Sequence, residues 1–324
     1  MNCSNSNCKK EIRNYYTCSK CGKSFCTNAC MTEHTLEHHT TKIKRGSGSG
    51  RVSGTKSLFQ KSGTFLKEII NDPQYAIEKF EFVKSKHGDL QELGSGAFGD
   101  VFLAKTKRDG KHYAIKQMEK AKIVETGASL DVIYNEINFH QRLIHENIVR
   151  LYSHHEDDKN FYLIMDYSNS GTVFNVIKRS KGLDEDTAFK YFIQAVTAVG
   201  FLHDNGLVHR DLKPENMLVD DQEQVRLCDF GWCVDISQGQ RVTFCGTYEY
   251  MAPELIKELP YDTSIDVWSL GILLYELLHG YSPFRAQNNE DCDDYTEIFK
   301  NILKYNFKIE KEISKNCQDL LTSK

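Results

Sequence analysis

The chain has 324 residues, of which 40% are apolar, enough for one large core and a small additional module. Its formal net charge at pH 7 is −4, so it lacks the overall positive charge that holds nucleic acid electrostatically. No apolar run approaches the roughly 18 residues that cross a bilayer, and the first residues, MNCSNSNCKKEIRNYY, contain no signal-peptide stretch. We therefore expect an intracellular protein without a membrane span and do not expect direct nucleic-acid binding.

Cysteines concentrate at the N-terminus, where six of the 11 lie within the first 30 residues and histidines follow. In a chain without a secretory signal, such clustering favours metal binding over disulfides. Eight candidate zinc ligands result: Cys3, Cys8, Cys18, Cys21, Cys26, Cys30, His34 and His38. Their number fits two structural Zn²⁺ ions with four ligands each, and His39 is an alternative to His38.

We expect the two zinc sites to interleave along residues 1–40. One ion would take the first and third cysteine pairs, and the other would take Cys18, Cys21, His34 and His38. A segment of about 40 residues buries too little apolar surface to fold alone, so metal would supply the folding energy. The pattern resembles HIT- and MYND-type fingers and predicts a targeting module for a partner protein. The alternative is a disordered tail with free thiols.

Composition divides the rest of the chain into three parts. Residues 41–63 are rich in glycine and serine and predict a flexible linker. Residues 64–88 have a partly helical pattern and predict an N-terminal extension of the main domain. From residue 89 to residue 324, short strand-like runs come first and longer helix-like runs come later, which predicts an α+β domain.

The run LGSGAFGDVFLAK lies between two strand-like segments and allows backbone to approach an anion at Gly94, Gly96 and Gly99, with Val101 opening the returning strand. Taken alone, three such glycines are weak evidence of phosphate binding. Lys116 follows in an alternating strand, and the helix-like run SLDVIYNEINFHQRLIHEN places Glu136 at the edge of an apolar face. A pair between this lysine and this glutamate would hold the lysine against nucleotide phosphates.

The runs His209–Asn216 and Asp229–Gly231 contain the residue types that phosphoryl transfer needs. A carboxylate that accepts the proton of the attacking hydroxyl is supplied by Asp211, and Lys213 is placed to steady the γ-phosphate. Oxygen ligands for Mg²⁺ are supplied by Asn216 and Asp229. Together with the glycine run, Lys116 and Glu136, these segments occur in order at workable spacings, which a chance arrangement rarely produces.

Residues 89 to about 320 therefore resemble a eukaryotic protein kinase, and HRDLKPEN resembles the Ser/Thr class. The run DFGW at Asp229–Trp232 and the pattern of Arg241, Thr243, Cys245, Gly246 and Thr247 resemble Aurora kinases more closely. The resemblance implies a bilobal fold with a β-rich N-lobe and a helical C-lobe, and an enzyme that transfers the γ-phosphoryl of Mg·ATP to protein Ser/Thr hydroxyls. It further implies that these residues complete the nucleotide site: Leu93, Ala114, Asp166, Ser168, Glu215 and Leu218.

The resemblance also implies regulation and partners. Phosphorylation of Thr243 would draw in Arg210, an otherwise unengaged guanidinium beside Asp211, and order the loop. Thr247 would contact Asp211 and Lys213 at the substrate floor. His140 occupies a position where most kinases have an apolar residue; buried without a partner it would seat its helix poorly, so we expect an activator on the N-lobe, unless the histidine is half-exposed and harmless.

Substrates with arginine upstream of the acceptor are a further implication of the resemblance, with Glu215 and nearby acids such as Asp186 as candidates for recognition. So is a location in cytoplasm and nucleus, at spindle, centrosome or chromosomes. The family continues past a motif like CQDLLTSK with an arginine that pairs with the glutamate matching Glu254, so the kinase domain is expected to be C-terminally incomplete. The alternative function is a catalytically weak kinase-fold scaffold with a zinc-finger adaptor.

Overall fold

The computed structural model describes residues 73–96, 98–236, 241, 243, 245–285 and 295–323, together with the backbone of residues 16–17 and 24–25. Two units can be distinguished, one formed by residues 1–65 and 121–129 and the other by residues 66–120 and 130–324. In the first unit, β1 (Tyr16–Thr17) and β2 (Ser24–Phe25) pair antiparallel. The eight predicted zinc ligands lie outside the described residues. Helix α3 covers Lys120–Glu125.

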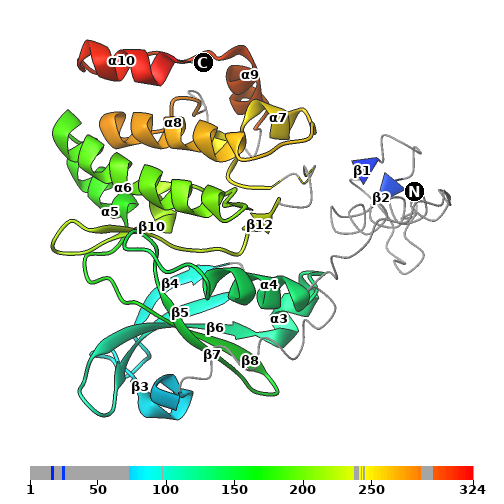
Figure 1. Cartoon of the computed structure of the whole chain (residues 1–324), viewed down its shortest axis with the longest axis vertical. Helices are drawn as coiled ribbons and strands as arrows, with labels where there is room; N and C mark the ends of the chain where they lie inside the picture. The colour runs from blue at the N-terminus through cyan, green and yellow to red at the C-terminus, as the bar shows by residue number, and fades with distance from the viewer. Residues whose placement is uncertain are drawn as a thin grey trace, which may run out of the picture. The chain divides into compact units, whose positions relative to one another are not determined.

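The second unit begins with two short 3₁₀ helices, η1 (Pro73–Tyr75) and η2 (Ile77–Lys79), and then a six-stranded antiparallel sheet. Five strands follow the spatial order β3-β5-β6-β8-β7, and β4 pairs with β5. Their bounds are β3 Phe80–Phe82, β4 Glu92–Gly96, β5 Gly99–Thr106, β6 His112–Glu119, β7 Leu151–Glu156 and β8 Asn160–Met165. Helix α4 (Asp131–His140), labelled in Figure 1, follows α3. Its residues Ile133 and Ile137 are buried.

The second half of this unit is mainly helical, with α6 and α8 side by side in Figure 1. The helices are α5 (Val173–Ser180), α6 (Glu185–Asp204), α7 (Pro253–Ile256), α8 (Ser264–His279), α9 (Thr296–Lys304) and α10 (Lys315–Thr322). Asp184 caps α6 by accepting a hydrogen bond from the Thr187 backbone N–H. Gly280 ends α8 with a φ of 86°, and an added Cβ there would lie 2.9 Å from backbone atoms of Lys181 and Gly182, so only glycine fits.

Short strands on the helical core present the loops that carry the chemistry. The antiparallel pairs are β9 (Leu207–Val208) with β12 (Val234–Asp235), and β10 (Met217–Val219) with β11 (Val225–Leu227). The HRDLKPEN run lies between β9 and β10 and includes the 3₁₀ helix η3 (Pro214–Asn216), whereas Asp229 follows β11. Buried side chains such as Leu202, Leu227 and Leu273 join these strands to one core. The loops are thus fixed on a rigid base.

The predicted strand-then-helix order is confirmed, with three differences. The extension forms 3₁₀ turns and contributes β3 to the sheet, so the sheet starts ahead of residue 89, the predicted boundary. Strand β7 was not predicted, because the polar run LYSHHE lacks apolar alternation. The helix-like run SLDVIYNEINFHQRLIHEN was expected to carry Ile144 on its apolar face, but α4 ends at His140 and Ile144 lies beyond it with 62% exposure. Glu254, expected to lack an arginine partner, has none among the described residues and accepts a hydrogen bond from the Ser264 hydroxyl (3.1 Å).

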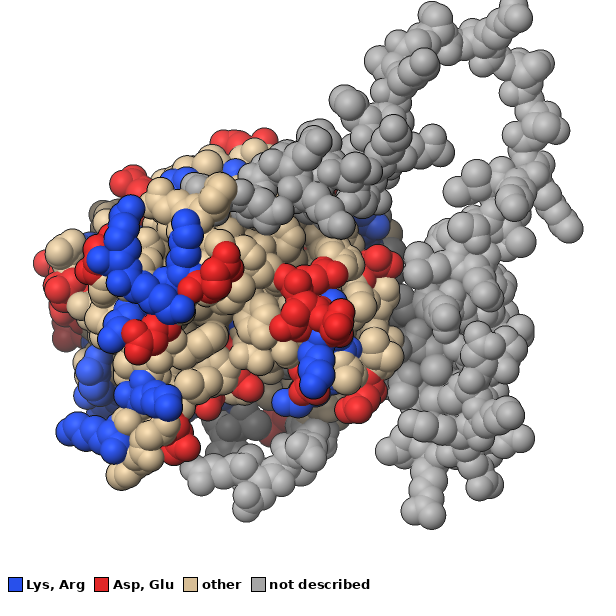
Figure 2. Space-filling model, turned by 90° about the horizontal axis from the view of Figure 1, so that it is seen from below, with Lys and Arg blue, Asp and Glu red and all other residues tan. Residues whose placement is uncertain are grey.

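Acidic and basic side chains share the surface seen from the sheet end of the molecule (Figure 2). None of the helices in the described part of the chain combines the length and apolar character that crossing a membrane requires.

Candidate active site

Lys116 on β6 and Glu136 on α4 form a buried ion pair, with 2.8 Å between the lysine Nζ and the glutamate Oε1. Asp229 Oδ1 lies 3.8 Å from the same Nζ. Burial lowers the pKa of Lys116, but the two carboxylates outweigh this effect and raise the pKa above its ordinary value. Burial likewise opposes ionisation of Asp229, yet Lys116 keeps the pKa of this carboxyl below its usual range. Both groups are therefore charged at neutral pH, and the predicted pair is formed.

A second cluster surrounds Asp211 in the HRDLKPEN loop. Lys213 Nζ lies 3.0 Å from Asp211 Oδ2 and donates to the Thr247 hydroxyl at 2.8 Å. This hydroxyl donates to Asp211 Oδ1 at 2.9 Å, so the contacts expected for Thr247 are present. The Asn216 side-chain nitrogen donates to the Asp211 carbonyl (2.8 Å) and to its Oδ2 (2.9 Å). Lysine, threonine and asparagine thus fix the carboxylate of Asp211 in one orientation.

Asp266, the third residue of α8, hydrogen bonds to the backbone of the HRDLKPEN loop. Its carboxylate is fully buried and accepts backbone N–H groups of His209 and Arg210, each at 2.9 Å, as well as His203 Nε2. Arg210 has a φ of 71°, a left-handed conformation that costs a non-glycine residue about 1–3 kcal/mol and persists only where neighbours enforce it. Asp266 is the neighbour that enforces it. Nothing in the sequence around Asp266 indicates this role.

A line of buried rings joins the two clusters. Phe230 lies 4.5 Å from the ring of His140 and 5.4 Å from that of His209. His140 is 2% exposed, and its Nε2 donates to the Val149 carbonyl at 2.6 Å. Burial lowers the pKa of His140 to about 4, so the ring is neutral at physiological pH. The half-exposed reading is therefore wrong, and the reason for expecting an activator, an unpartnered buried histidine, does not apply.

The glycine run forms the turn between β4 and β5, and β5 pairs with β6 so that Val101 lies opposite Lys116. An added Cβ at Gly99 would lie 2.1 Å from the Gln117 carbonyl oxygen, whereas Gly94 has open space around it. Gly99 is thus required by sheet packing, and Gly94 leaves room for a ligand. Leu93 on β4 is 39% exposed.

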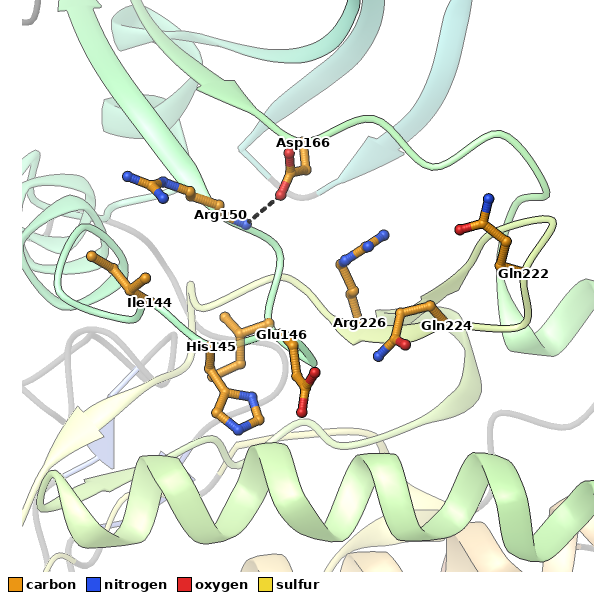
Figure 3. Close-up of a pocket in the computed structure, with 9 residues that line it drawn as sticks. Ile144, His145, Glu146, Arg150, Asp166, Gln222, Gln224 and Arg226 are labelled. Atoms are coloured by element: carbon orange, nitrogen blue, oxygen red, sulfur yellow. Dashed lines mark hydrogen bonds between the residues drawn. The ribbon is translucent and has the colours of Figure 1, made fainter.

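The other predicted nucleotide-site residues lie on several elements. Ala114 on β6 is buried opposite Met165, and Leu218 on β10 bridges to Thr172. Ser168 donates to the Val219 carbonyl at 2.7 Å. The Asp166 side chain accepts hydrogen bonds from the Tyr152 hydroxyl (2.7 Å) and the Arg150 backbone N–H (3.3 Å), so contact with adenine would have to come from backbone groups. A cavity of about 520 Å³ lies behind this segment and is bordered by Asp166 and Arg226, not by the catalytic cluster (Figure 3).

Mg·ATP fits the donor chemistry of these clusters. Asp229 offers a carboxylate, and Asn216 uses its amide nitrogen for Asp211, which leaves its amide oxygen for a cation. Lys116 carries a fixed positive charge beside Asp229, and phosphate oxygens are acceptors that suit such a charge.

Three carboxyls, those of Glu215, Glu249 and Glu276, lie close enough to interact electrostatically, and the sequence analysis identified only Glu215. Burial, opposed by a hydrogen bond from Tyr250 and reinforced by Glu215 and Glu249, raises the pKa of Glu276 to about 7. Burial also raises the pKa of Glu249. Because Glu276 holds its proton in the folded chain at pH values between about 4.5 and 7, its contribution to stability is lost as pH rises through 7. Asp186, the other acid considered, lies at the start of α6.

Thr243 is exposed in the segment between Asp229 and Glu254. The sequence analysis expected the Arg210 guanidinium to be unengaged, and this expectation is wrong. Its Nε donates to the Trp232 carbonyl at 2.6 Å and its Nη1 to the Tyr261 hydroxyl at 2.8 Å. Both acceptors are neutral.

Comparison with known proteins agrees with this geometry. The protein kinase domain family matches residues 88–323. An Aurora kinase from Schizosaccharomyces pombe is 37% identical over 230 residues, covering 71% of this chain and 63% of that protein, and one from Yarrowia lipolytica is 36% identical over 273 residues, covering 84% and 70%. A calcium/calmodulin-dependent protein kinase type 1 from Caenorhabditis elegans is 36% identical over 244 residues, covering 74% and 69%. The chain belongs to the protein kinase family, carries an ATP-dependent Ser/Thr kinase domain, and is of the Aurora type.

Proposed function

We propose that this chain transfers the γ-phosphoryl of Mg·ATP to Ser/Thr hydroxyls of protein substrates. The observation that carries the proposal is the fixed Asp211 carboxylate, held by Lys213, Asn216 and Thr247. This group accepts the proton of an attacking hydroxyl, Lys213 neutralises charge on the transferred group, and Lys116 positions the phosphates. Magnesium, held by Asp229 and Asn216, neutralises charge on the phosphate oxygens when bound.

The test is incubation of the chain with Mg·ATP and a serine peptide that has arginine two and three residues upstream. Mass spectrometry is expected to find one added phosphoryl group on the serine. A chain that binds Mg·ATP, as followed by a thermal shift, but adds none would favour the scaffold alternative. The intact Lys116–Glu136 pair and Asp229 speak for the enzyme, since a scaffold has no physical need of them.

The substrate preference we propose is for arginine near the acceptor. Its support is the cluster of Glu215, Glu249 and Glu276: burial raises the pKa of Glu276, and the charges of Glu215 and Glu249 raise it further. A guanidinium placed among them would relieve the repulsion between these charges and form charge-assisted hydrogen bonds. Arginine binding therefore requires deprotonation of Glu276.

The preference predicts a pH-dependent KM. As pH rises from 6 to 8, Glu276 ionises and the KM for the arginine peptide should fall, while a peptide with alanine in place of arginine shows no such change. Glu276→Gln should raise the KM for the arginine peptide about tenfold or more at pH 8, flatten its pH dependence and leave kcat unchanged. Glu312→Gln, at an exposed acid on the same lobe, is the control. An unchanged KM in Glu276→Gln would contradict the proposal.

Regulation by phosphorylation of Thr243 is a further part of the proposal. A phosphate there would offer Arg210 an anionic acceptor stronger than the Trp232 carbonyl and the Tyr261 hydroxyl that it now contacts. Moving the guanidinium to the phosphate would tie the loop around Thr243 to the segment that carries Asp211.

The chain phosphorylated at Thr243 is expected to have a kcat/KM about 10- to 100-fold above that of the unphosphorylated chain. This ratio corresponds to the free energy of one strong charge-assisted hydrogen bond. Thr243→Ala should stay at the low level after the same treatment, and Arg210→Lys should lose most of the gain because lysine cannot bind bidentately. Thr322→Ala, at another exposed threonine, serves as control. Equal rates for Thr243→Ala and the phosphorylated chain would exclude this regulation.

For the N-terminal segment we propose a two-zinc module that targets the kinase to a partner protein. The cysteine and histidine count supports it, and the strands β1 and β2 flank Cys18 and Cys21 in the sequence. By similarity to Aurora kinases, the proposed location is intracellular and mitotic. Metal analysis of the purified chain should give two zinc ions per chain, and Cys18→Ser should give fewer, whereas Cys317→Ser should not; less than one ion in the parent chain would contradict the module.

A further inference from the structure

The 3₁₀ helix η1 of the N-terminal extension is bound to strand β7. The backbone carbonyl of Tyr75, the last residue of η1, accepts hydrogen bonds from the Ser153 hydroxyl and from His155 Nε2, each at 2.8 Å. The ring of Tyr75 stacks on that of Tyr152, with 4.7 Å between the ring centroids and 30° between the ring planes. Tyr152 on β7 is therefore in direct contact with the extension.

The ring of Tyr152 has two further neighbours. The ring of Tyr113 meets it edge-on, with 5.4 Å between the centroids, and the guanidinium of Arg150 lies 5.2 Å from its centroid. Because a phenol oxygen lies in the plane of its ring, neighbours that fix the ring also fix the position of the hydroxyl. Burial raises the pKa of Tyr152, so this hydroxyl keeps its proton at physiological pH and acts as a donor.

This hydroxyl donates to Asp166, the first residue of the segment 166–172 between β8 and α5, which we call the hinge. The distance to Asp166 Oδ1 is 2.7 Å, and the Arg150 backbone N–H donates to Oδ2 at 3.3 Å (Figure 3). The Asp166 backbone N–H in turn donates to the Arg150 carbonyl at 3.1 Å. Because this N–H is already used, the carbonyl is the backbone group of Asp166 that is left for a nucleotide base.

Adenine and guanine differ in the group that such a carbonyl meets. Adenine has an amino group at position 6, which donates hydrogen bonds, whereas guanine has an oxygen there, which only accepts them. A carbonyl held in one orientation therefore pairs with adenine and leaves two acceptors facing each other with guanine. A carbonyl that is free to turn away loses this discrimination, since both its attraction to one base and its repulsion of the other depend on its orientation.

We propose that Tyr152, supported by Tyr75 of the extension, is a positioning residue that fixes the hinge at Asp166 and thereby sets the preference of the nucleotide site for adenine over guanine. The proposal rests on the proposed function and extends it to selection of the base. Both tyrosines act through Asp166 and need no contact with the nucleotide. Their effect is on nucleotide affinity and not on proton transfer at Asp211.

The experiment measures the Kd values of Mg·ATP and Mg·GTP for the full chain without peptide, by displacement of a fluorescent ATP analogue. Tyr152→Phe keeps the ring and removes only the hydroxyl. It is expected to raise the Kd of ATP about fivefold or more, the effect of one lost hydrogen bond, and to leave the Kd of GTP within about twofold of its parent value. At saturating ATP, kcat for the arginine peptide should equal that of the parent chain.

Variants of Tyr75 test the part played by the extension. Tyr75→Ala removes the stack and should raise the Kd of ATP, whereas Tyr75→Phe keeps the ring and should not. The double variant Tyr75→Ala/Tyr152→Phe should bind ATP no more weakly than Tyr152→Phe, because both changes act through one hydrogen bond. Tyr162→Phe on β8 is the matched control: its hydroxyl also donates to a carboxylate, that of Asp157 at 3.1 Å, and its loss should change neither Kd.

An unchanged Kd of ATP in Tyr152→Phe would overturn the proposal. So would an equal rise for both nucleotides, which reports a general disturbance of the site, or a parent chain that binds ATP and GTP equally well. Additive effects in the double variant would overturn the role of the extension, because Tyr75 would then act independently of Tyr152. A parent chain that binds ATP selectively but phosphorylates no peptide would refute the proposed function alone, since the Kd values do not depend on phosphotransfer.

Discussion

Asp211→Asn is expected to lower kcat for peptide phosphorylation about 10²- to 10⁴-fold, the range that a positioned general base contributes. An amide cannot accept the proton of the attacking hydroxyl, and it returns only one acceptor to the groups that now share two carboxylate oxygens. The KM for ATP should change little, because the predicted phosphate contacts come from Lys116 and Asp229.

Steady-state kinetics with the arginine peptide, together with a thermal shift on Mg·ATP addition, separates these effects. Asp204→Asn, at an exposed acid near the end of α6, is the control and should retain full activity. A kcat within threefold of the parent chain in Asp211→Asn would show that another group accepts the proton.

Lys116→Met is expected to cost both activity and stability. The side chain of Glu136 is only 3% exposed, and without the lysine its carboxylate becomes an uncompensated buried charge. Removing one partner of such a pair costs about 3–5 kcal/mol in the free energy of unfolding. Loss of the fixed charge at the phosphates should lower kcat about 10²-fold or more.

The double variant Lys116→Met/Glu136→Leu separates the two losses. Because no carboxylate is then left unpaired, most of the stability should return, while phosphotransfer stays low. Denaturant unfolding and peptide kinetics on the three chains make the comparison. A double variant as unstable as Lys116→Met would show that the ion pair is not the source of the loss.

Local sequence patterns predicted the strand-then-helix order of the main domain and the pairing of Lys116 with Glu136. The short strand-like runs correspond to β5, β6 and β8, and the longer helix-like runs correspond to α6 and α8. Strand β7 was not predicted, because its polar residues are stabilised by partners far away in the sequence: Ser153 and His155 both hydrogen bond to the Tyr75 carbonyl.

The parts of the site that were missed depend on contacts between residues far apart in the chain. Asp266 holds the HRDLKPEN loop across 57 positions of sequence, and nothing local to it signals that role. Glu249 and Glu276 lie far from Glu215 in the sequence, and only the folded C-lobe brings the three carboxyls close together. The sequence also could not predict that the buried His140 has a hydrogen-bond partner. This partner is the backbone carbonyl of Val149, and no side-chain pattern indicates a backbone acceptor.

The central claim, that Asp229 and its neighbours support phosphotransfer from Mg·ATP, is tested most directly by one comparison. Phosphate incorporation into the arginine-containing serine peptide is measured for the 324-residue chain beside Asp229→Asn. The account predicts one phosphoryl group on the serine with the parent chain and a rate at least 10²-fold lower with Asp229→Asn, because the amide provides a weaker ligand for magnesium. Equal incorporation by both chains, or none by the parent chain, would contradict it.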